Sequence, residues 1–399
     1  MNSIDKATKF IEKYFFNNKT CLIYDFRINK YRNAWYHLPN PDDINRDYPN
    51  PCGWGTGMED GVLSGGTALD ALIADYNVTE NQNLKEIADK LFKGLMLCAD
   101  CGKTKGFIAR AVSPKDKTSH YTDTSRDQYT HWVYSAVRFY DSPLCDESQK
   151  ADIRRVIVSL AERCEENVIK ENDYNLLRDD GLKGLVAKMY GEVGPHEYLR
   201  LPMFYLAAYH VSGDVHWKQQ CLKYANEAME KTKPHEPHKH RGYVTLQLQY
   251  SLRLMYDLSD DERFKSDCLE LMKIYAEYSE NKTIEKGENL INNVDRREWN
   301  FRYKAWNKVK EMYDGGVFEG KRYLNPAQSE MKENKALYPI REVGEYASVA
   351  ALCPNRRVQE KLLTILENLA EKIDYKNHYT YAPMLLVSGY KLCLENLKK

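Results

Sequence analysis

The stretch "SRDQYTHWVYSAVRFY", residues 125–140, decides the predicted fold class. Apolar side chains recur on nearly every side of it, which is typical of a helix buried among other helices. Its first turns nevertheless hold a polar and aromatic group formed by Arg126, Asp127, His131 and Trp132. We therefore expect the N-terminal end of this buried helix to face a cleft.

Eleven further helical segments follow the same two patterns. Five are apolar nearly all round and predict buried helices: residues 60–76, 199–211, 242–256, 340–352 and 381–394. Six are amphipathic with one charged face: residues 4–15, 83–97, 153–168, 217–229, 264–276 and 358–373. The two types alternate along the chain. We therefore predict an all-α (α/α)6 toroid, a single domain over 1–399 closed by 4–15 against 381–394, with an open solenoid as the alternative.

The connections predict where the functional site lies. Loops from a buried helix to the next amphipathic one are short, whereas several in the other direction are long: 21–59, 102–122, 172–196 and 281–337. Long loops on a rigid scaffold commonly carry function. The N-terminal ends of the inner helices should form the mouth of a cleft, and their dipoles favour anionic ligands there. Any strands should be short and lie in the insertions.

Composition excludes several classes of partner. Lys plus Arg equals Asp plus Glu, 58 against 58, so no net charge draws the chain to nucleic acid. No apolar run approaches the ~20 residues of a membrane span. The ten cysteines fall mostly on apolar helix faces, which favours a reducing, cytoplasmic compartment. A trimmed leader would be consistent with a periplasmic form instead. We expect an oligosaccharide substrate as the partner, which the abundant tyrosines would suit, and neither nucleic acid nor a membrane.

Carboxylates and aromatic side chains gather at two helix starts. "WGTGMEDGVLSGG" supplies Trp54, Glu59 and Asp60, and "HYTDTSRDQYTHW" supplies Asp123 and Asp127 together with His120 and Tyr121. Glycoside cleavage needs a proton donor and a second carboxylate, so Asp127, Asp60, Glu59 and Asp123 are the catalytic candidates. The alternative interpretation is that Asp60 and Asp127 merely cap their helices.

Other loops should bring substrate-binding groups to the same face. The complete set of candidates is Trp54, Arg110, His120, Tyr121, Arg126, His131, Trp132, His196, Arg200, His240, Trp299 and Glu342. Arginines among them would suit the carboxylate of a uronic acid, although each could also form a surface ion pair.

These residues resemble the six-hairpin glycosidase superfamily, and within it the unsaturated glucuronyl and rhamnogalacturonyl hydrolases and unassigned bacterial relatives. "MEDGVLSGGTALDALIADY" would place Asp60, and "SRDQYTHWVYSAV" would place Asp127, at the two inner-helix aspartates of those enzymes. The resemblance implies that Asp127 is the general acid, which in those hydrolases hydrates a conjugated double bond of the sugar. The sequence departs from their pattern around both acids, which keeps Glu59 and Asp123 as substitutes.

Three other functions fit the same scaffold. A polysaccharide lyase would use His120, Tyr121, Tyr129 or His131 to remove a proton, with an arginine that neutralises the sugar carboxylate. A sugar epimerase would use paired histidines, for which the "HEPHKHR" loop is a candidate. A sugar-binding protein or an assembly scaffold would catalyse nothing.

The sequence favours a protein without a metal or cofactor. His235, His238 and His240 have a spacing that could hold a metal ion, but no carboxylate lies at ligand spacing nearby. Motifs for phosphate loops, dinucleotides, serine hydrolases and zinc proteases do not occur. We therefore predict that exhaustive chelation leaves the activity intact.

Overall fold

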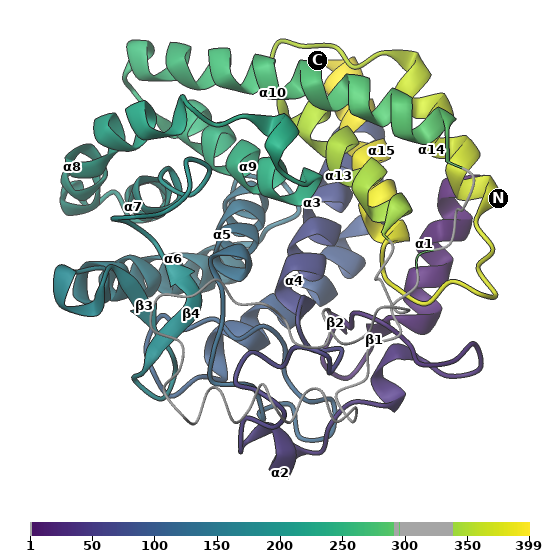
Figure 1. The fold of residues 1–399 in the computed structure, drawn as a ribbon, viewed down its shortest axis with the longest axis horizontal. Helices are drawn as coiled ribbons and strands as arrows, with labels where there is room; N and C mark the ends of the chain where they lie inside the picture. The colour runs from purple at the N-terminus through teal and green to yellow at the C-terminus, as the bar shows by residue number, and fades with distance from the viewer. Residues whose placement is uncertain (1, 291–294, 296–337) are drawn as a thin grey trace.

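The computed structural model describes residues 2–290, 295 and 338–399, and within them the helices form a closed double ring (Figure 1). The inner ring consists of α3 (Gly61–Thr79), α5 (Arg126–Tyr140), α7 (Arg200–Ser212), α9 (Gly242–Leu258), α13 (Pro339–Leu352) and α15 (Pro383–Lys398). Each packs against the next, and α15 returns to α3. The predicted all-α (α/α)6 toroid is confirmed, and the open solenoid is excluded.

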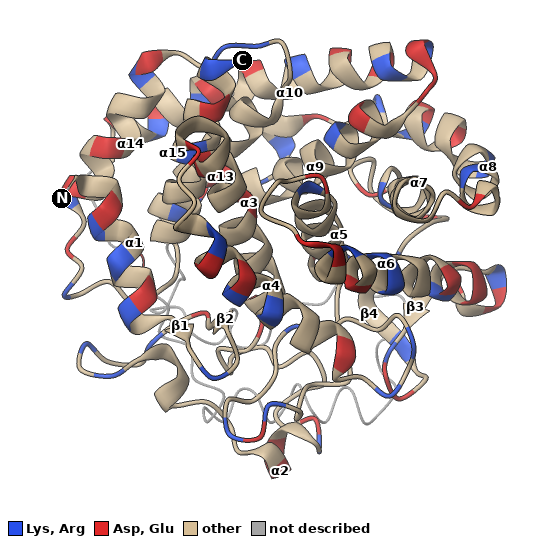
Figure 2. Cartoon of the chain, turned by 180° about the vertical axis from the view of Figure 1, so that it is seen from behind, with Lys and Arg blue, Asp and Glu red and all other residues tan. Residues whose placement is uncertain are grey.

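The outer ring carries many of the charged residues. It consists of α1 (Ser3–Tyr14), α4 (Leu84–Asp100), α6 (Glu147–Asn167), α8 (Val215–Thr232), α10 (Glu262–Glu288) and α14 (Glu360–Lys372). Figure 2 shows Lys, Arg, Asp and Glu along outer helices such as α6, α8 and α10. Helix α1 packs against α14 and α15, so the predicted closure of the ring by the two chain ends is confirmed.

The remaining described elements are short. Two hairpins pair β1 (Phe16–Asn17) with β2 (Leu22–Ile23) and β3 (Asn175–Leu177) with β4 (Lys183–Lys188). Single turns of helix occur at α2 (Pro41–Ile44) and in the 3-10 segments Ala34–Tyr36, Lys170–Asn172 and Pro237–Lys239. The prediction of short strands is confirmed. All ten cysteines are free, and no described helix is long and apolar enough to span a membrane.

The predicted boundaries of several helices differ from the structure, and the largest difference lies at the end of α10. The sequence placed a helix over 264–276 and a loop from 281, whereas α10 continues to Glu288. Its second half is rich in Glu, Lys and Asn, which hid the helical pattern. Glu280 is nevertheless buried and pairs with Arg356, while Thr283 is buried against the core. The single-domain organisation over 1–399 stays a prediction.

Small residues bring the inner helices close together, as expected from the glycines of α3. A Cβ on Gly66 would lie 2.9 Å from the carbonyl oxygen of His131 in α5. The contact of α13 with α15 is closer still, because a Cβ on Gly344 would lie 2.5 Å from the carbonyl carbon of Leu385. The absence of a side chain at these positions therefore sets the spacing within the ring.

Gly344→Ala is expected to destabilise the protein by about 1–3 kcal/mol, since the added methyl group meets backbone that cannot rotate away. The matched control is Gly65→Ala, also within an inner helix. There the nearest atom to the new Cβ is the flexible Cδ2 of Leu95 at 3.3 Å, and alanine favours a helix by about 1 kcal/mol. Urea unfolding of both variants checks the expectation, and equal stability of the two would contradict it.

Candidate active site

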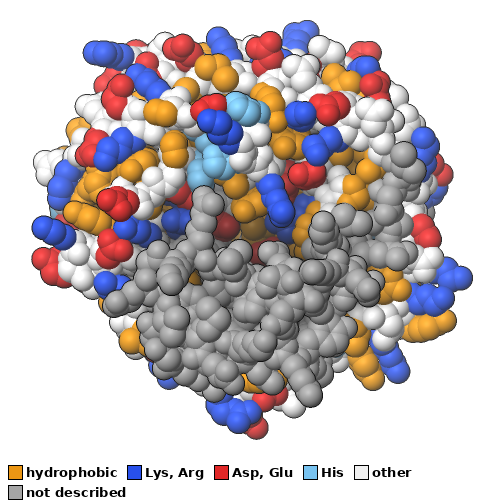
Figure 3. Space-filling model, in the orientation of Figure 1, with side chains coloured by type: hydrophobic (Ala, Val, Ile, Leu, Met, Phe, Trp, Pro, Cys, Tyr) orange, Lys and Arg blue, Asp and Glu red, His pale blue; other side chains and the backbone are white. Residues whose placement is uncertain are grey.

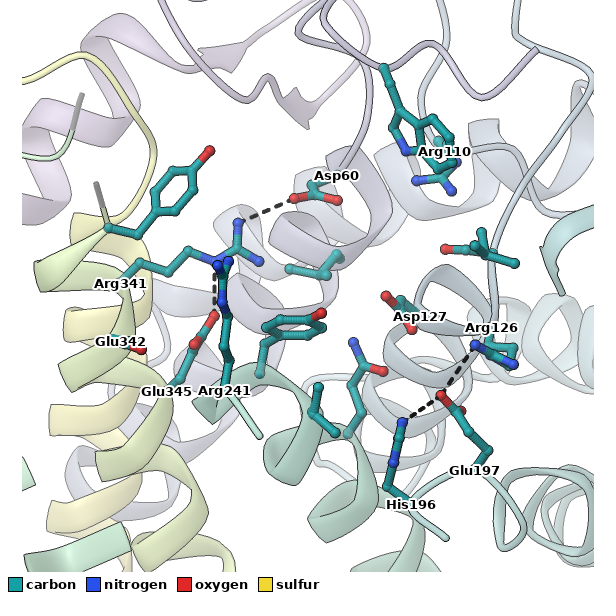
Figure 4. Close-up of a pocket in the computed structure, with 18 of the residues that line it drawn as sticks. Asp60, Arg110, Arg126, Asp127, His196, Glu197, Arg241, Arg341, Glu342 and Glu345 are labelled. Carbon is teal, nitrogen blue, oxygen red and sulfur yellow. Dashed lines mark hydrogen bonds and ion pairs between the residues drawn. The ribbon is translucent and has the colours of Figure 1, made fainter. Parts of the chain in front are cut away.

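A cavity of about 750 Å³ lies at the N-terminal ends of the inner helices. Its walls come from residues at or near the starts of five of them: Asp60 before α3, Arg126 and Asp127 in α5, Arg200 in α7, Arg241, Tyr243 and Val244 at α9, and Pro339, Arg341, Glu342 and Glu345 in α13. Figure 4 shows Asp60, Arg126, Asp127, Arg241, Arg341, Glu342 and Glu345 around the cavity. The cavity lies where the sequence predicted the mouth of the cleft. Helix α5 begins with polar residues because Arg126 and Asp127 line this cavity.

Asp60 occupies the N-cap position of α3 but makes no side-chain cap hydrogen bond. Its Oδ2 instead accepts hydrogen bonds from the Tyr381 hydroxyl at 3.0 Å and from Arg341 Nη1 at 3.3 Å. The backbone of the preceding turn is fixed by Asp25, whose carboxylate accepts from the amides of Glu59 at 2.6 Å and Asp60 at 3.0 Å. Asp60 therefore holds the N-cap position, but its carboxylate does not cap the helix as the alternative interpretation required.

Asp127 lies in the first turn of α5, where Ser125 holds the cap position. Its Oδ1 accepts from Arg200 Nη1 at 3.2 Å, whereas Oδ2 has no hydrogen-bond partner among the described residues. The side chain is 34% exposed, compared with 1% for Arg200. Asp127 therefore presents one carboxylate oxygen to the cavity, while a buried arginine fixes the other.

A buried ionic network supports this wall of the cavity. Glu197 pairs with Arg200 Nε at 2.6 Å. It also pairs with Arg126 Nη2 at 3.3 Å and with His196 Nε2 at 2.9 Å (Figure 4). Burial alone would raise the pKa of Glu197, but the two guanidinium groups and His196 hold it well below its usual range. Glu197 thus stays charged and orients Arg200, which in turn holds Asp127.

Arg341 organises the opposite wall. Besides Asp60 it binds Glu345 Oε1 through Nε at 2.8 Å. Burial raises the pKa of Glu345, against the effect of Arg341, which lowers it. Nearby Glu342 pairs with Lys286 of α10 at 2.8 Å. Arg241 also lines the cavity, and it forms no ion pair within the described part of the chain.

Several predicted site residues do line the cavity. They are Asp60, Asp127, Trp54, Arg110, Arg126, His196, Arg200 and Glu342. The guanidinium of Arg110 lies 5.8 Å from the ring of Trp54 and donates through Nη1 to the carbonyl of Glu59 at 3.1 Å.

The cavity is also lined by residues that the sequence analysis missed, among them Tyr243, Gln247 and Tyr338. Their position at or near the starts of inner helices is the signal that could have identified them.

The two substitute carboxylates lie elsewhere. Glu59 is 7% exposed, and its Oε1 accepts from the amide of Gly55 at 2.6 Å. Asp123 is fully buried and accepts from the amides of Leu185 at 3.1 Å and Thr124 at 2.8 Å. Both side chains hold loop backbone in place because buried amides need acceptors. The structure does not bring either carboxylate into the cavity.

Four predicted substrate contacts are also taken up by structural interactions. Trp132 is fully buried and donates to the carbonyl of Leu95 at 3.1 Å, and Tyr121 donates to that of Tyr48 at 2.7 Å. His131 Nδ1 lies 2.9 Å from the carbonyl oxygen of Asp127, and burial lowers its pKa to about 4. These residues and His120 do not line the cavity. Trp299 lies outside the described residues.

His120 pairs with Asp179, Nε2 to Oδ2, at 3.2 Å. Burial alone would lower its pKa, but hydrogen bonds, foremost that to Asp179, raise it to about 10. A raised pKa means that this pair stabilises the fold fully below about pH 6.5 and ceases to do so as the pH rises through about 10.

His120→Asn is therefore expected to lower the free energy of unfolding by about 1.5–3 kcal/mol at neutral pH, and this deficit should shrink towards pH 10. Denaturant unfolding across this range checks it, and a constant deficit would contradict the assignment.

The histidine loop before α9 adds a feature that spacing did not predict. His240 does not line the cavity, but its ring lies 5.0 Å from that of His196 and 4.9 Å from that of His235. Burial lowers the pKa of His235 to about 3, and the neighbouring His196 and His240 contribute to this lowering. His238 points elsewhere, since it is 60% exposed and pairs with Glu236.

Comparisons with known proteins leave the chemistry to be argued from the site. No family model and no curated protein matches the chain. Solved structures with a similar fold include the GH76A α-1,6-mannanase from Salegentibacter sp. HEL1_6, which is 12% identical with a TM-score of 0.39 over 69% of this chain and 86% of that one. An unsaturated glucuronyl hydrolase specific for heparin is 10% identical with a TM-score of 0.46 over 100% and 97%. A sugar epimerase from a ruminal bacterium is 11% identical with a TM-score of 0.41 over 83% and 86%. The closed double ring is a property of this chain's own helix packing, and function has to be argued from the site.

Proposed function

We propose that this protein is a glycoside hydrolase that acts on an oligosaccharide, with Asp127 as the proton donor and Asp60 as the second carboxylate. The observation that carries this proposal is that both aspartates stand at the starts of neighbouring inner helices and line one cavity (Figure 4). Cleavage of a glycosidic bond uses two carboxylates in this way.

The different surroundings of the two aspartates support the division of roles. Asp127 has one oxygen without a partner among the described residues and is the more exposed of the two, which suits a group that donates a proton to a leaving oxygen. Asp60 accepts from Arg341 and Tyr381, so its charge is held in a fixed orientation. A fixed carboxylate suits the orientation of water or the stabilisation of positive charge on the sugar ring.

The cavity also favours a sugar that bears a carboxylate. Arg241 lines it without an ion pair among the described residues, whereas Arg126, Arg200 and Arg341 are paired with protein carboxylates. An unpaired arginine beside a sugar site can bind a uronic acid through two parallel hydrogen bonds. Trp54 offers an aromatic face at the same cavity.

The rival functions have weaker support in the geometry. None of the lyase bases named from the sequence lines the cavity: His120, Tyr121, Tyr129 and His131 do not appear among its walls. An epimerase would draw on paired histidines, and of the three clustered histidines only His196 reaches the cavity.

A screen of neutral and uronate-containing oligosaccharides tests the proposal. We expect new reducing ends without a new chromophore, and none from Asp60→Asn or Asp127→Asn protein prepared in the same way. A conjugated chromophore would show a lyase, and an isomer of unchanged mass would show an epimerase. Binding without turnover would show a sugar-binding protein. Each of these three outcomes would overturn the proposal.

A further inference from the structure

Three histidines from two separate segments meet beside the cavity. His196 precedes α7, while His235 and His240 flank the short helix Pro237–Lys239 before α9. One ring nitrogen from each lies within 4.8 Å of the others. Figure 3 shows histidine side chains at the surface of this face of the molecule, beside basic side chains.

Buried polar atoms need hydrogen-bond partners, and two nitrogen atoms in this cluster have none in the part of the chain that the structure describes. Nδ1 of His196 and Nδ1 of His235 are buried and have no hydrogen-bond partner among the described residues. His235 is only 5% exposed. A buried polar atom without a partner costs about 1–3 kcal/mol, so an uncompensated pair of them needs an explanation.

The other ring nitrogens are oriented by neighbouring groups. Nε2 of His196 lies 2.9 Å from the carboxylate of Glu197, and Nε2 of His235 lies 3.5 Å from the hydroxyl of Thr245. A histidine that donates through Nε2 presents the lone pair of Nδ1. Metal-binding histidines are commonly held in this way by a carboxylate or another acceptor behind them.

We propose that His196, His235 and His240 form a binding site for a transition-metal ion of the zinc class. Imidazole nitrogen is a preferred ligand of zinc, and three protein ligands leave a fourth tetrahedral position for water or another ligand. Zn–N bonds of about 2.0 Å set ligand nitrogens about 3.3 Å apart. The rings would therefore close slightly around the ion.

The proposal replaces the expectation of a metal-free protein, and it explains why sequence spacing misled. The H-x2-H-x-H pattern pointed to His238, whose side chain is exposed and pairs with Glu236. The third ligand is instead His196, which lies on a different loop and also lines the cavity. Metal binding at this cluster does not depend on the reaction proposed at Asp127, because it can be measured without a sugar.

Titration of chelator-treated full-length protein with zinc tests the site, using calorimetry and the shift in melting temperature. Wild type and His238→Ala should each bind one zinc ion in the cluster and gain stability from it. His235→Ala and His240→Gln should lose at least about 100-fold in affinity. His238→Ala is the matched control, since it removes a histidine from the same loop without touching the cluster. His240→Gln keeps the test valid if the more buried His235 variant fails to fold.

Cobalt substitution adds a readout of geometry. The cobalt protein should show visible absorption typical of tetrahedral nitrogen ligation, and this absorption should disappear in His240→Gln but not in His238→Ala. Failure of the wild-type protein to bind zinc would overturn the proposal. Equal affinity of wild type and His240→Gln would overturn it as well.

Discussion

Asp127→Asn is expected to lower kcat by about 10²–10⁴-fold while leaving the melting temperature unchanged. Asparagine has the same shape and can still accept the hydrogen bond from Arg200 through Oδ1. What it lacks is the proton that the proposed mechanism transfers to the leaving oxygen. Turnover and thermal unfolding of the same preparation separate a loss of chemistry from a loss of structure.

Glu342→Gln provides the matched control, because it neutralises another carboxylate that lines the same cavity. Glu342 pairs with Lys286 and has no role as proton donor, so its substitution should change KM more than kcat. Full turnover of Asp127→Asn on the true substrate would contradict the assignment. In that case Asp60 becomes the remaining candidate among the predicted carboxylates that line the cavity.

Arg138→Met is expected to destabilise the protein by about 3–5 kcal/mol. Arg138, in the last turn of α5, bonds Asp70 of α3 through Nε at 2.9 Å and Glu395 of α15 through Nη2 at 3.0 Å. Asp70 is fully buried and Glu395 is 5% exposed. Removal of the arginine leaves fully buried Asp70 without its cation at the junction of three inner helices, and it leaves Glu395 with the half-exposed Lys399 at 3.2 Å.

Arg155→Met is the control for this second prediction. Arg155 pairs with Asp100 between outer helices, but both side chains are about half exposed, at 51% and 47%. An exposed pair contributes at most about 1 kcal/mol. Denaturant unfolding of the two variants should therefore differ by several kilocalories per mole, and a similar small effect in both would contradict the role assigned to Arg138.

The fold could be predicted from sequence because its signal is local. Each buried helix, such as α5, is apolar on nearly all sides, and each outer helix, such as α4, has one charged face. Hydrophobic periodicity over a single helix captures this contrast. The second half of α10 escaped because its burial depends on partners distant in sequence, such as Arg356 for Glu280.

The sequence predicted those residues of the site that stand at the start of an inner helix. Asp60 and Asp127 were identified because each stands at a helix start beside a long loop. Glu59 and Asp123 also lie just before these two inner helices. Their carboxylates, however, accept hydrogen bonds from backbone amides and do not reach the cavity. The meeting of His196 with His235 and His240 depends on how two loops fold against each other, and no spacing within one loop contains that information.

One measurement tests the central claim most directly: mass spectrometry of the product formed in water enriched in heavy oxygen, with the oligosaccharide that the screen identifies. Hydrolysis at the cavity of Asp60 and Asp127 predicts one labelled oxygen per bond cleaved, and labelled product from Asp127→Asn at a rate about 10²–10⁴-fold lower. Cleavage without uptake of label would contradict the account and show elimination. Label uptake that persists in Asp127→Asn at the wild-type rate would contradict the proposed proton donor.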